Sequence, residues 1–347
     1  LCGMGAACVD GDEIALIPSH RKIEDETTTL LKAMGAYFAD GFSPALDKPF
    51  DGSSPQIVPL PTYAFQRSRH WLDASGRGLV QGTRGSDAWP LAGQELALPG
   101  GGTLHLLDIG PGVQRYLGDH LVYDQVVVPG AFYVGVMFAI GAHRWPDQAV
   151  ALTDVQFVEA LTFESAHESV PLHAHLEPDG ENRLKVTLAA YRSDSWTTHV
   201  TAFMELSDAT TSERLTLDAE EVFHEVGEAE LKKNLNELDI EWREQWRWLR
   251  ALAERGEQRV GRFECPEGVP MDSPIPGGLV DNSFTVPFAT ENNDREDKVP
   301  RLPFRIGSMV WFGEPRPIRW VSGAPTKIEE DIQTANLSYW DEHGELV

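Results

Sequence analysis

The stretch that decides the fold runs from residue 118 to residue 142 and reads GDHLVYDQVVVPGAFYVGVMFAIGA. Pro129 and Gly130 break an apolar run, and the apolar residues that follow, 130–142, predict a buried helix. The alternative, a membrane span, needs about 20 uninterrupted apolar residues. The apolar segment 126–142 is shorter than that and contains helix-breaking residues, so we expect no membrane span.

His120 lies at the rim of this apolar run. By its spacing alone, a histidine beside an apolar segment is more often packed in a core than catalytic. Asp281, in the segment GGLVDNSF, is by itself more often a helix N-cap than an acid. From these residues alone, both alternatives stay open for each side chain.

Strand-like runs separated by turns flank the predicted helix, among them GGTLHLLDI, SVPLHAHLEP, RLKVTLAAYR and WTTHVTAFMEL. A single helix among antiparallel strands indicates a sheet wrapped around one buried central helix. A similar order of predicted helix and strands follows an acidic connector at residues 226–237. We therefore interpret residues 88–225 and 238–347 as two related halves, although no repeat is evident at the residue level.

The second half opens with IEWREQWRWLRALAER, for which we predict a Trp-rich helix. On such a helix Arg243, Arg247 and Arg250 would share one face. A face of this kind is most often simply solvated. In a chain this acidic it is also the best candidate for contacting a phosphate group.

The 347-residue chain has a formal net charge of −25. This charge disfavours nucleic acid and anionic membranes as partners, and an acidic protein partner would need a local basic patch. The three cysteines lack pairing or metal-site spacing, and the chain opens without a secretory leader, so we expect a reducing, cytoplasmic setting. His173 and His175 alternate on one strand without a third ligand, so we expect no metal site.

The first 87 residues differ from the rest in composition and in predicted secondary structure. Residues 10–48 predict a short strand, EIALIPS, and an amphipathic helix within DETTTLLKAMGAYFADG. Residues 49–87 are rich in Pro, Ser and Gly and predict a linker or an extended wrapping segment. Because neither end of the chain has an evident start or stop, we expect a piece of a larger polypeptide.

His120, Asp124 and Pro129-Gly130 form a spaced pattern that, together with DVQFVEALTFES, LVDNSF and LPFRIGSMVWFG, resembles the dehydratase domain of modular type I polyketide synthases. VPLPTYAFQRSRHWL resembles the linker that follows the acyltransferase domain in those synthases, and the segment before it resembles the acyltransferase C-terminus. The resemblance implies an α+β double hot-dog fold, in which two antiparallel sheets each wrap a central helix, with a small N-terminal α/β-linker extension. The implied parts are an acyltransferase remnant (1–48), the linker (49–87), an N-terminal hot-dog half (88–225), the connector (226–237) and a C-terminal half (238–347).

The reaction implied by the resemblance removes water from a 3-hydroxyacyl thioester on the phosphopantetheine arm of an acyl carrier protein, and gives an α,β-unsaturated thioester. The resemblance assigns the base to His120 and the acid to Asp281, one from each half, and favours catalysis over packing or capping. No bound cofactor is implied. The implied partners are the carrier protein, neighbouring synthase domains and a second copy in a homodimer. The carrier phosphate would contact Arg243, Arg247 and Arg250.

Elementary chemistry agrees with these roles. Imidazole, with an ordinary pKa near 6.5, is a suitable base at neutral pH. Aspartate has an ordinary pKa of about 3.9, and an apolar site such as that of Leu279, Val280 and Phe284 raises it toward the range of a useful acid. Pro129 and Gly130 would begin the buried helix, whose unpaired N–H groups and dipole can hold the thioester carbonyl.

Several positions depart from the family pattern. Asp124 replaces a small residue, and its carboxylate either bonds nearby backbone or raises the basicity of His120. Thr285 stands where Gln or His usually supports the acid, and it has a shorter reach. Trp242 and Trp246 keep the aromatic ends of a Tyr-Gly-Pro-x-Phe-Gln segment whose Gly-Pro turn is lost. We expect these four residues, with Pro129 and Gly130, to line the substrate site. Dehydration therefore has two alternatives: double-bond isomerisation or oxa-Michael (pyran-type) cyclisation on the same fold, and a non-catalytic, degenerate domain.

Overall fold

The structure is a computed structural model, and the chain divides into two units, Leu1–Leu72 and Asp73–Val347, that are described separately. The structure describes residues 2–5, 8, 14–53, 88–210, 212–217, 222–226, 239–288, 302–328 and 332–347. Most of the predicted linker (49–87) and of the connector (226–237) lies outside the described residues, as does the motif VPLPTYAFQRSRHWL.

The first unit contains the helices α1 (Cys2–Gly5) and α2 (Glu26–Ala39) and the 3₁₀ turn η2 (Lys48–Phe50). The predicted amphipathic helix is confirmed as α2. It begins after Asp25, whose carboxylate accepts a hydrogen bond from the Thr28 N–H at 2.8 Å and so caps the helix. The strand predicted in EIALIPS is wrong, because residues 14–18 have no strand structure. An apolar run forms a strand only where a neighbouring strand pairs with it.

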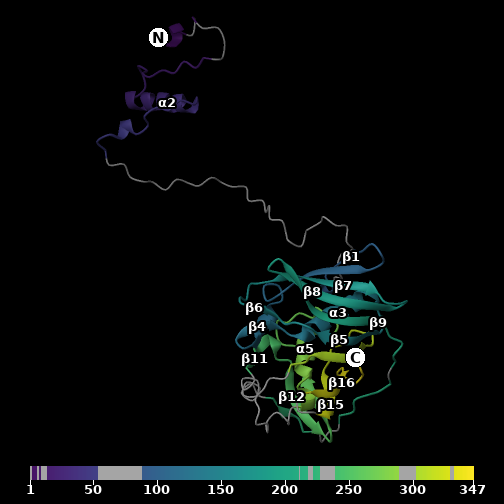
Figure 1. Ribbon diagram of the computed structural model, residues 1–347. Helices are drawn as coiled ribbons and strands as arrows, with labels where there is room; N and C mark the ends of the chain where they lie inside the picture. Colours follow the sequence, from purple (N-terminus) through teal and green to yellow (C-terminus); the bar gives the residue numbers. More distant parts are fainter. Residues whose placement is uncertain are drawn as a thin grey trace. The chain divides into compact units, whose positions relative to one another are not determined.

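In the second unit, the N-terminal half folds into a seven-stranded antiparallel sheet beside helix α3 (Figure 1). The sheet order is β1 (Gln94–Ala97), β2 (Thr103–Ile109), β7 (Val170–Pro178), β8 (Arg183–Arg192), β9 (Ser195–Leu206), β5 (Val150–Phe157) and β14 (Arg305–Trp311). The predicted helix is confirmed as α3 (Gly130–Arg144), which is buried at every residue from 131 to 142. A helix that is apolar all round needs this complete covering.

The C-terminal half forms a five-stranded sheet beside helix α5 (Gly277–Ser283) (Figure 1). Its order is β10 (His224–Glu225), β12 (Leu249–Arg255), β13 (Gln258–Phe263), β15 (Trp320–Ile328) and β16 (Gln333–Trp340). A third, four-stranded sheet has the order β11 (Ile240–Trp242), β3 (His120–Val122), β4 (Gln125–Val128) and β6 (Leu161–Phe163). Short 3₁₀ turns complete the unit: η4 (Pro90–Ala92), η5 (Arg115–Asp119), η6 (Glu244–Trp246) and η7 (Val286–Phe288).

The Trp-rich helix predicted for residues 240–255 is wrong. The segment forms strand β11, turn η6 and strand β12. Burial in β12 alternates, with Leu249, Ala251 and Ala253 buried and Arg250 and Leu252 only partly so. This two-residue period places one side of the strand in the core, and pairing with β13 outweighs the helix propensity of Glu, Arg, Leu and Ala.

The two halves meet through their central helices, and glycines permit the close approach. A Cβ on Gly277 would lie 2.6 Å from Cα of Phe132, in the first turn of α3. Gly135, one turn later, faces the carbonyl oxygen of Ile275, 3.2 Å from where its Cβ would be. The fold is therefore a double hot-dog, in which each half supplies a sheet and a buried helix. Among the described residues, no helix is long and apolar enough to cross a membrane.

Candidate active site

His120 is the first residue of β3 and is buried, with 6% of its surface exposed. Its Nδ1 lies 2.7 Å from the carbonyl oxygen of Val127, across the hairpin. A carbonyl oxygen only accepts, so Nδ1 donates and Nε2 of the neutral ring carries the free lone pair. The hairpin therefore fixes both the orientation and the tautomer of a possible base.

Asp281 comes from α5 in the other half and is also buried. Its Oδ2 accepts a hydrogen bond from Nε1 of Trp246 at 2.8 Å. Burial raises the pKa of the Asp281 carboxyl, while the nearby His120 and the Trp246 hydrogen bond act in the opposite direction. A carboxyl group whose pKa is raised keeps its proton more readily, as an acid catalyst must.

The structure brings these two predicted residues together. His120 Nε2 and Asp281 Oδ2 are 3.7 Å apart. Trp246 completes the group, because its ring lies 5.4 Å from the imidazole, centroid to centroid, and its N–H points to the carboxylate. A base and an acid from different halves therefore face one small volume.

Asn282, beside Asp281, is a residue that the sequence analysis did not single out. Its Oδ1 accepts hydrogen bonds from the backbone N–H groups of Trp248 and Leu249, at 2.8 and 3.2 Å. Its Nδ2 donates to the carbonyl oxygen of Trp246 at 2.9 Å. This buried amide ties α5 to the segment that carries the tryptophan. The only available signal was its position next to the candidate acid.

Thr285 does not contact the acid. Its hydroxyl donates to the carbonyl oxygen of Asn282 at 2.8 Å and closes the end of α5. Orientation of the Asp281 carboxylate comes instead from Trp246, the residue with an indole N–H within reach.

Asp124 lies on the exposed turn of the β3–β4 hairpin, between Val122 and its partner Gln125. Tyr123 and Asp124 have φ angles of 49° and 61°, so both adopt the left-handed conformation of a tight two-residue turn. Aspartate tolerates this conformation better than most residues. This position supports the interpretation that Asp124 serves the turn. It gives no support to a direct effect of Asp124 on His120.

Trp242 is the cross-strand partner of His120 in the β11–β3 pair and is buried. Its Nε1 has no hydrogen-bond partner among the described residues. Asp119 links β3 to turn η6. Its Oδ2 accepts a hydrogen bond from the Gln245 N–H at 2.7 Å, and its carbonyl oxygen accepts one from the Arg243 N–H at 2.8 Å. Turn η6, which carries Trp246, is thus attached directly to the residue before His120.

Pro129 is the N-cap of α3, and Gly130 is its first residue. The N–H groups of a first helical turn mostly lack acceptors within the helix, although that of Phe132 here donates to the carbonyl oxygen of Pro129 at 2.9 Å. A Cβ on Gly130 would come within 2.7 Å of the Phe157 ring, so glycine is required here by packing. The residues that begin the helix directly follow Val127 and Val128, and Val127 holds the imidazole.

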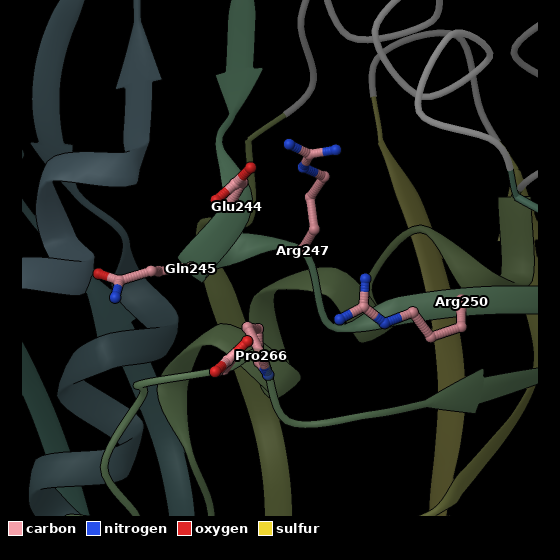
Figure 2. A pocket seen from close by; sticks show the side chains of 6 residues that line it. Glu244, Gln245, Arg247, Arg250 and Pro266 are labelled. Atoms are coloured by element: carbon pink, nitrogen blue, oxygen red, sulfur yellow. The ribbon is translucent and has the colours of Figure 1, made fainter.

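The three arginines do not share a helix face, because the helix is absent. Arg243 precedes η6 and bonds Glu241 at 3.2 Å. Arg247 and Arg250 line a pocket of about 520 Å³ together with Glu244, Gln245, Pro266 and Glu267. Figure 2 shows both guanidinium groups at this pocket, with Glu244 on the preceding turn. The pocket lies on the same turn as the buried Trp246.

No metal centre is found within the described part of the chain, where no group of three or more His, Cys, Asp or Glu side chains is arranged to hold an ion. The cysteines Cys2, Cys8 and Cys265 are free. Residues 98–102 form the turn between β1 and β2, which pair antiparallel.

Comparisons with known proteins agree with this architecture. Residues 90–191 match the family described as polyketide synthase dehydratase domain. Polyketide synthase GfsB of Streptomyces halstedii is 30% identical over 230 residues, which are 60% of this chain and 4% of that protein. Mycoketide-CoA synthase of Mycobacterium tuberculosis is 35% identical over 140 residues, 39% of this chain and 3% of that protein. The chain thus spans only a few per cent of the length of these relatives.

Solved structures show the same fold. The dehydratase domain from the CurJ module of curacin polyketide synthase has a TM-score of 0.66 at 19% identity, covering 76% of this chain and 94% of that one. The dehydratase domain of a mycocerosic acid synthase-like synthase also has a TM-score of 0.66, at 18% identity, with coverage of 76% and 94%. The fold is thus the double hot-dog of these solved domains. Within residues 90–191, the chain carries the sequence of a polyketide synthase dehydratase domain.

Proposed function

We propose that this domain removes water from a 3-hydroxyacyl thioester carried on the phosphopantetheine arm of an acyl carrier protein. The observation that carries the proposal is the buried pair of His120 Nε2 and Asp281 Oδ2, 3.7 Å apart. The pair combines a free imidazole lone pair with a carboxyl group whose pKa is raised by burial. These are the two groups that a β-elimination of water requires.

The proposed reaction balances within the pair. Nε2 of His120 accepts the proton from the α-carbon, and the electrons of that C–H bond form the new double bond. The β-carbon–oxygen bond breaks, and the Asp281 carboxyl gives its proton to the departing oxygen, which leaves as water. Transfer of the proton from the imidazolium to the carboxylate then restores the starting state.

The first turn of α3 supports binding of the thioester carbonyl in this proposal. Its N–H groups and the positive end of the helix dipole stabilise negative charge that develops on a carbonyl oxygen. Trp242, directly across from His120, offers a second donor through its unpaired indole N–H.

The wild-type domain should turn over a 3-hydroxyacyl pantetheine thioester, and mass spectrometry should show loss of one water. Both hydroxyl epimers need to be offered, because the proposal does not depend on the configuration at the β-carbon. Unchanged substrate for both epimers, in a folded sample, would contradict the proposal. An isomerised or cyclic product would instead support the alternative chemistry, which no observation here separately favours.

The pocket of Arg247 and Arg250 supports docking of the carrier, and we include the carrier phosphate as its ligand. Arg250 Nε lies 3.7 Å from Glu264 Oε2. Glu244 and Glu267 also line the pocket, so carboxylates already balance part of the guanidinium charge. In a chain with a net charge of −25, a local pair of guanidinium groups is the kind of site that a phosphate requires. Arg243, bonded to Glu241 outside the pocket lining, is a weaker candidate.

Reversing both charges, Arg247→Glu with Arg250→Glu, should raise KM for the carrier-bound substrate by about tenfold, or about 1.4 kcal/mol. KM for the small pantetheine thioester should stay within about twofold, because that substrate lacks the carrier. Arg183→Glu is a matched control, since Arg183, on β8 in the seven-stranded sheet, has similar exposure and is paired with Asp179 and Glu205. Equal changes for the two substrates would show that the arginines do not bind the carrier.

The remaining assignments are also proposals. The first unit, with α2, is proposed to be the end of an acyltransferase domain, and residues 49–87 its linker. The free cysteines support a reducing, cytoplasmic setting. The sheet edges in the described part of the chain are β1, β14, β10, β16, β11 and β6, and we propose that a homodimer forms through edge strands.

A further inference from the structure

Tyr116 and Asp272 form a buried polar pair that the proposed reaction does not use. The Tyr116 hydroxyl donates a hydrogen bond to Oδ2 of Asp272. Each residue has 7% of its surface exposed. Tyr116 belongs to η5, four residues before the candidate base, and Asp272 lies in the loop before α5, which carries the candidate acid. The bond therefore joins the two segments that supply the active site.

The ring of Tyr116 also contacts the group that orients the acid. It stacks on the ring of Trp246, with the centroids 6.1 Å apart and the planes at 21°. The N–H of that indole donates to Oδ2 of Asp281 at 2.8 Å. A shift of the tyrosine ring would therefore move the indole N–H relative to the carboxylate.

The acceptor side of the pair is held in place. The carbonyl oxygen of Asp272 accepts from the Leu91 N–H at 3.2 Å. The next residue, Ser273, donates its hydroxyl to the carbonyl oxygen of Gly135, on α3, at 2.7 Å. The loop that carries the carboxylate is thus attached to the first turn of the unit and to the central helix of the other half.

The pair is costly as a purely structural contact. Burial raises the pKa of Asp272 to about 6, which means that the folded protein opposes the charged form. An apolar pair of similar volume often stabilises a core better than a buried polar one. A phenylalanine at position 116 could stack on the indole equally well, so stacking alone does not require the hydroxyl.

We propose that Tyr116 and Asp272 are positioning residues, which act together to hold Trp246, and through it Asp281, in the geometry needed for catalysis. The expected effect on kcat rests on the proposed function. The expected effect on the position of Trp246 does not. The hydroxyl fixes the tyrosine ring, and the ring fixes the indole. The indole N–H then fixes the Asp281 carboxyl group, which gives up the proton.

Three variants test the chain of contacts. Tyr116→Phe keeps the ring and removes the hydrogen bond, Asp272→Ala removes the acceptor, and Asp272→Asn keeps an acceptor oxygen of the same shape. The first readout is the indole N–H resonance of Trp246 in ¹⁵N-labelled protein, identified among the 10 tryptophans by its absence in Trp246→Phe. The second is kcat and KM for a pantetheine thioester. Ser322→Ala, which removes the buried bond from Trp340 Nε1 at 2.9 Å, is the control for loss of a buried hydrogen bond.

Tyr116→Phe and Asp272→Ala should each move the Trp246 resonance and lower kcat about tenfold, with KM within about twofold, because misplacing a catalytic group mainly slows the chemical step. Asp272→Asn should restore both readouts, and Ser322→Ala should change neither. An unmoved resonance, or a moved one with wild-type kcat, overturns the inference. If the wild type itself shows no turnover, the proposed function fails, and the resonance alone then decides whether the pair positions Trp246.

Discussion

The His120→Gln variant should lose activity by a factor of about 10² to 10⁴, the usual contribution of a positioned general base. Glutamine is a polar, uncharged side chain of similar length, so it can occupy the space of the imidazole without adding a charge. It has no basic lone pair for the α-proton. The measurement is kcat with a pantetheine thioester, followed by mass spectrometry of the product, on protein whose folding is checked by circular dichroism.

His105→Gln is the matched control for this variant. His105 is also a buried histidine whose Nδ1 lies close to a backbone carbonyl oxygen, that of Ala92, at 2.8 Å. It lies on β2, outside the group of side chains around Asp281. We expect His105→Gln to keep near-wild-type kcat in its folded fraction. Equal losses in the two variants would mean that His120 is a packed core residue and that the proposed base is wrong.

The central helix and the pairing of His120 with Asp281 were the features most accessible from the sequence. The apolar run that begins at Gly130 is too long for a strand and too short for a membrane span, which leaves a buried helix. The Pro-Gly pair marks its start because proline suits a position whose N–H has no partner. The two titratable residues were identified through a family pattern, since periodicity alone favoured packing for one and capping for the other.

The segment around Trp246 shows where local signals mislead. Its Glu, Arg, Leu and Ala residues favour a helix, yet β11 pairs with the distant strand β3 and β12 pairs with β13, the next strand along the chain. Helix propensity amounts to a few tenths of a kcal/mol per residue, and tertiary pairing and burial readily outweigh it. The same error placed Arg243 beside Arg247 and Arg250. The pocket instead arises from the turn between two strands.

The positioning contacts were not predictable, because their partners are far apart in the chain. Tyr116 and Asp272 are separated by 156 positions, and neither stands in a recognisable motif. Asn282 bonds backbone groups 33 and 34 positions earlier. A single sequence carries no record of such distances. The exchange of β14 into the N-terminal sheet, where it pairs with β5, was unpredictable for the same reason.

Asp281→Asn should lower activity and raise stability, and we expect both changes to be large. The amide has no acidic proton for the departing hydroxyl, so we expect kcat to fall by about 10² to 10⁴. The amide keeps an oxygen that can accept from the Trp246 N–H, so the site retains its shape. The free energy of unfolding at neutral pH should rise, because the substitution removes a carboxyl group whose charged form is opposed by burial.

The sign follows from linkage. Burial raises the pKa of Asp281 in the folded protein above its value in the unfolded chain, so the folded protein binds the proton more tightly. Wild-type stability is therefore lost as pH rises from the unfolded pKa through the folded one, whereas the Asp281→Asn variant lacks this loss. The gap in Tm between the two proteins should be present at pH 7 and should close at or below about pH 4, where both states of the wild type are protonated. Each 1 kcal/mol corresponds to about 2–4 °C in a domain of this size, within reach of a thermal scan. A variant that is inactive and also less stable at pH 7 would mean that the carboxylate stabilises the fold as an ion pair with His120, and that Asp281 is not the proton donor.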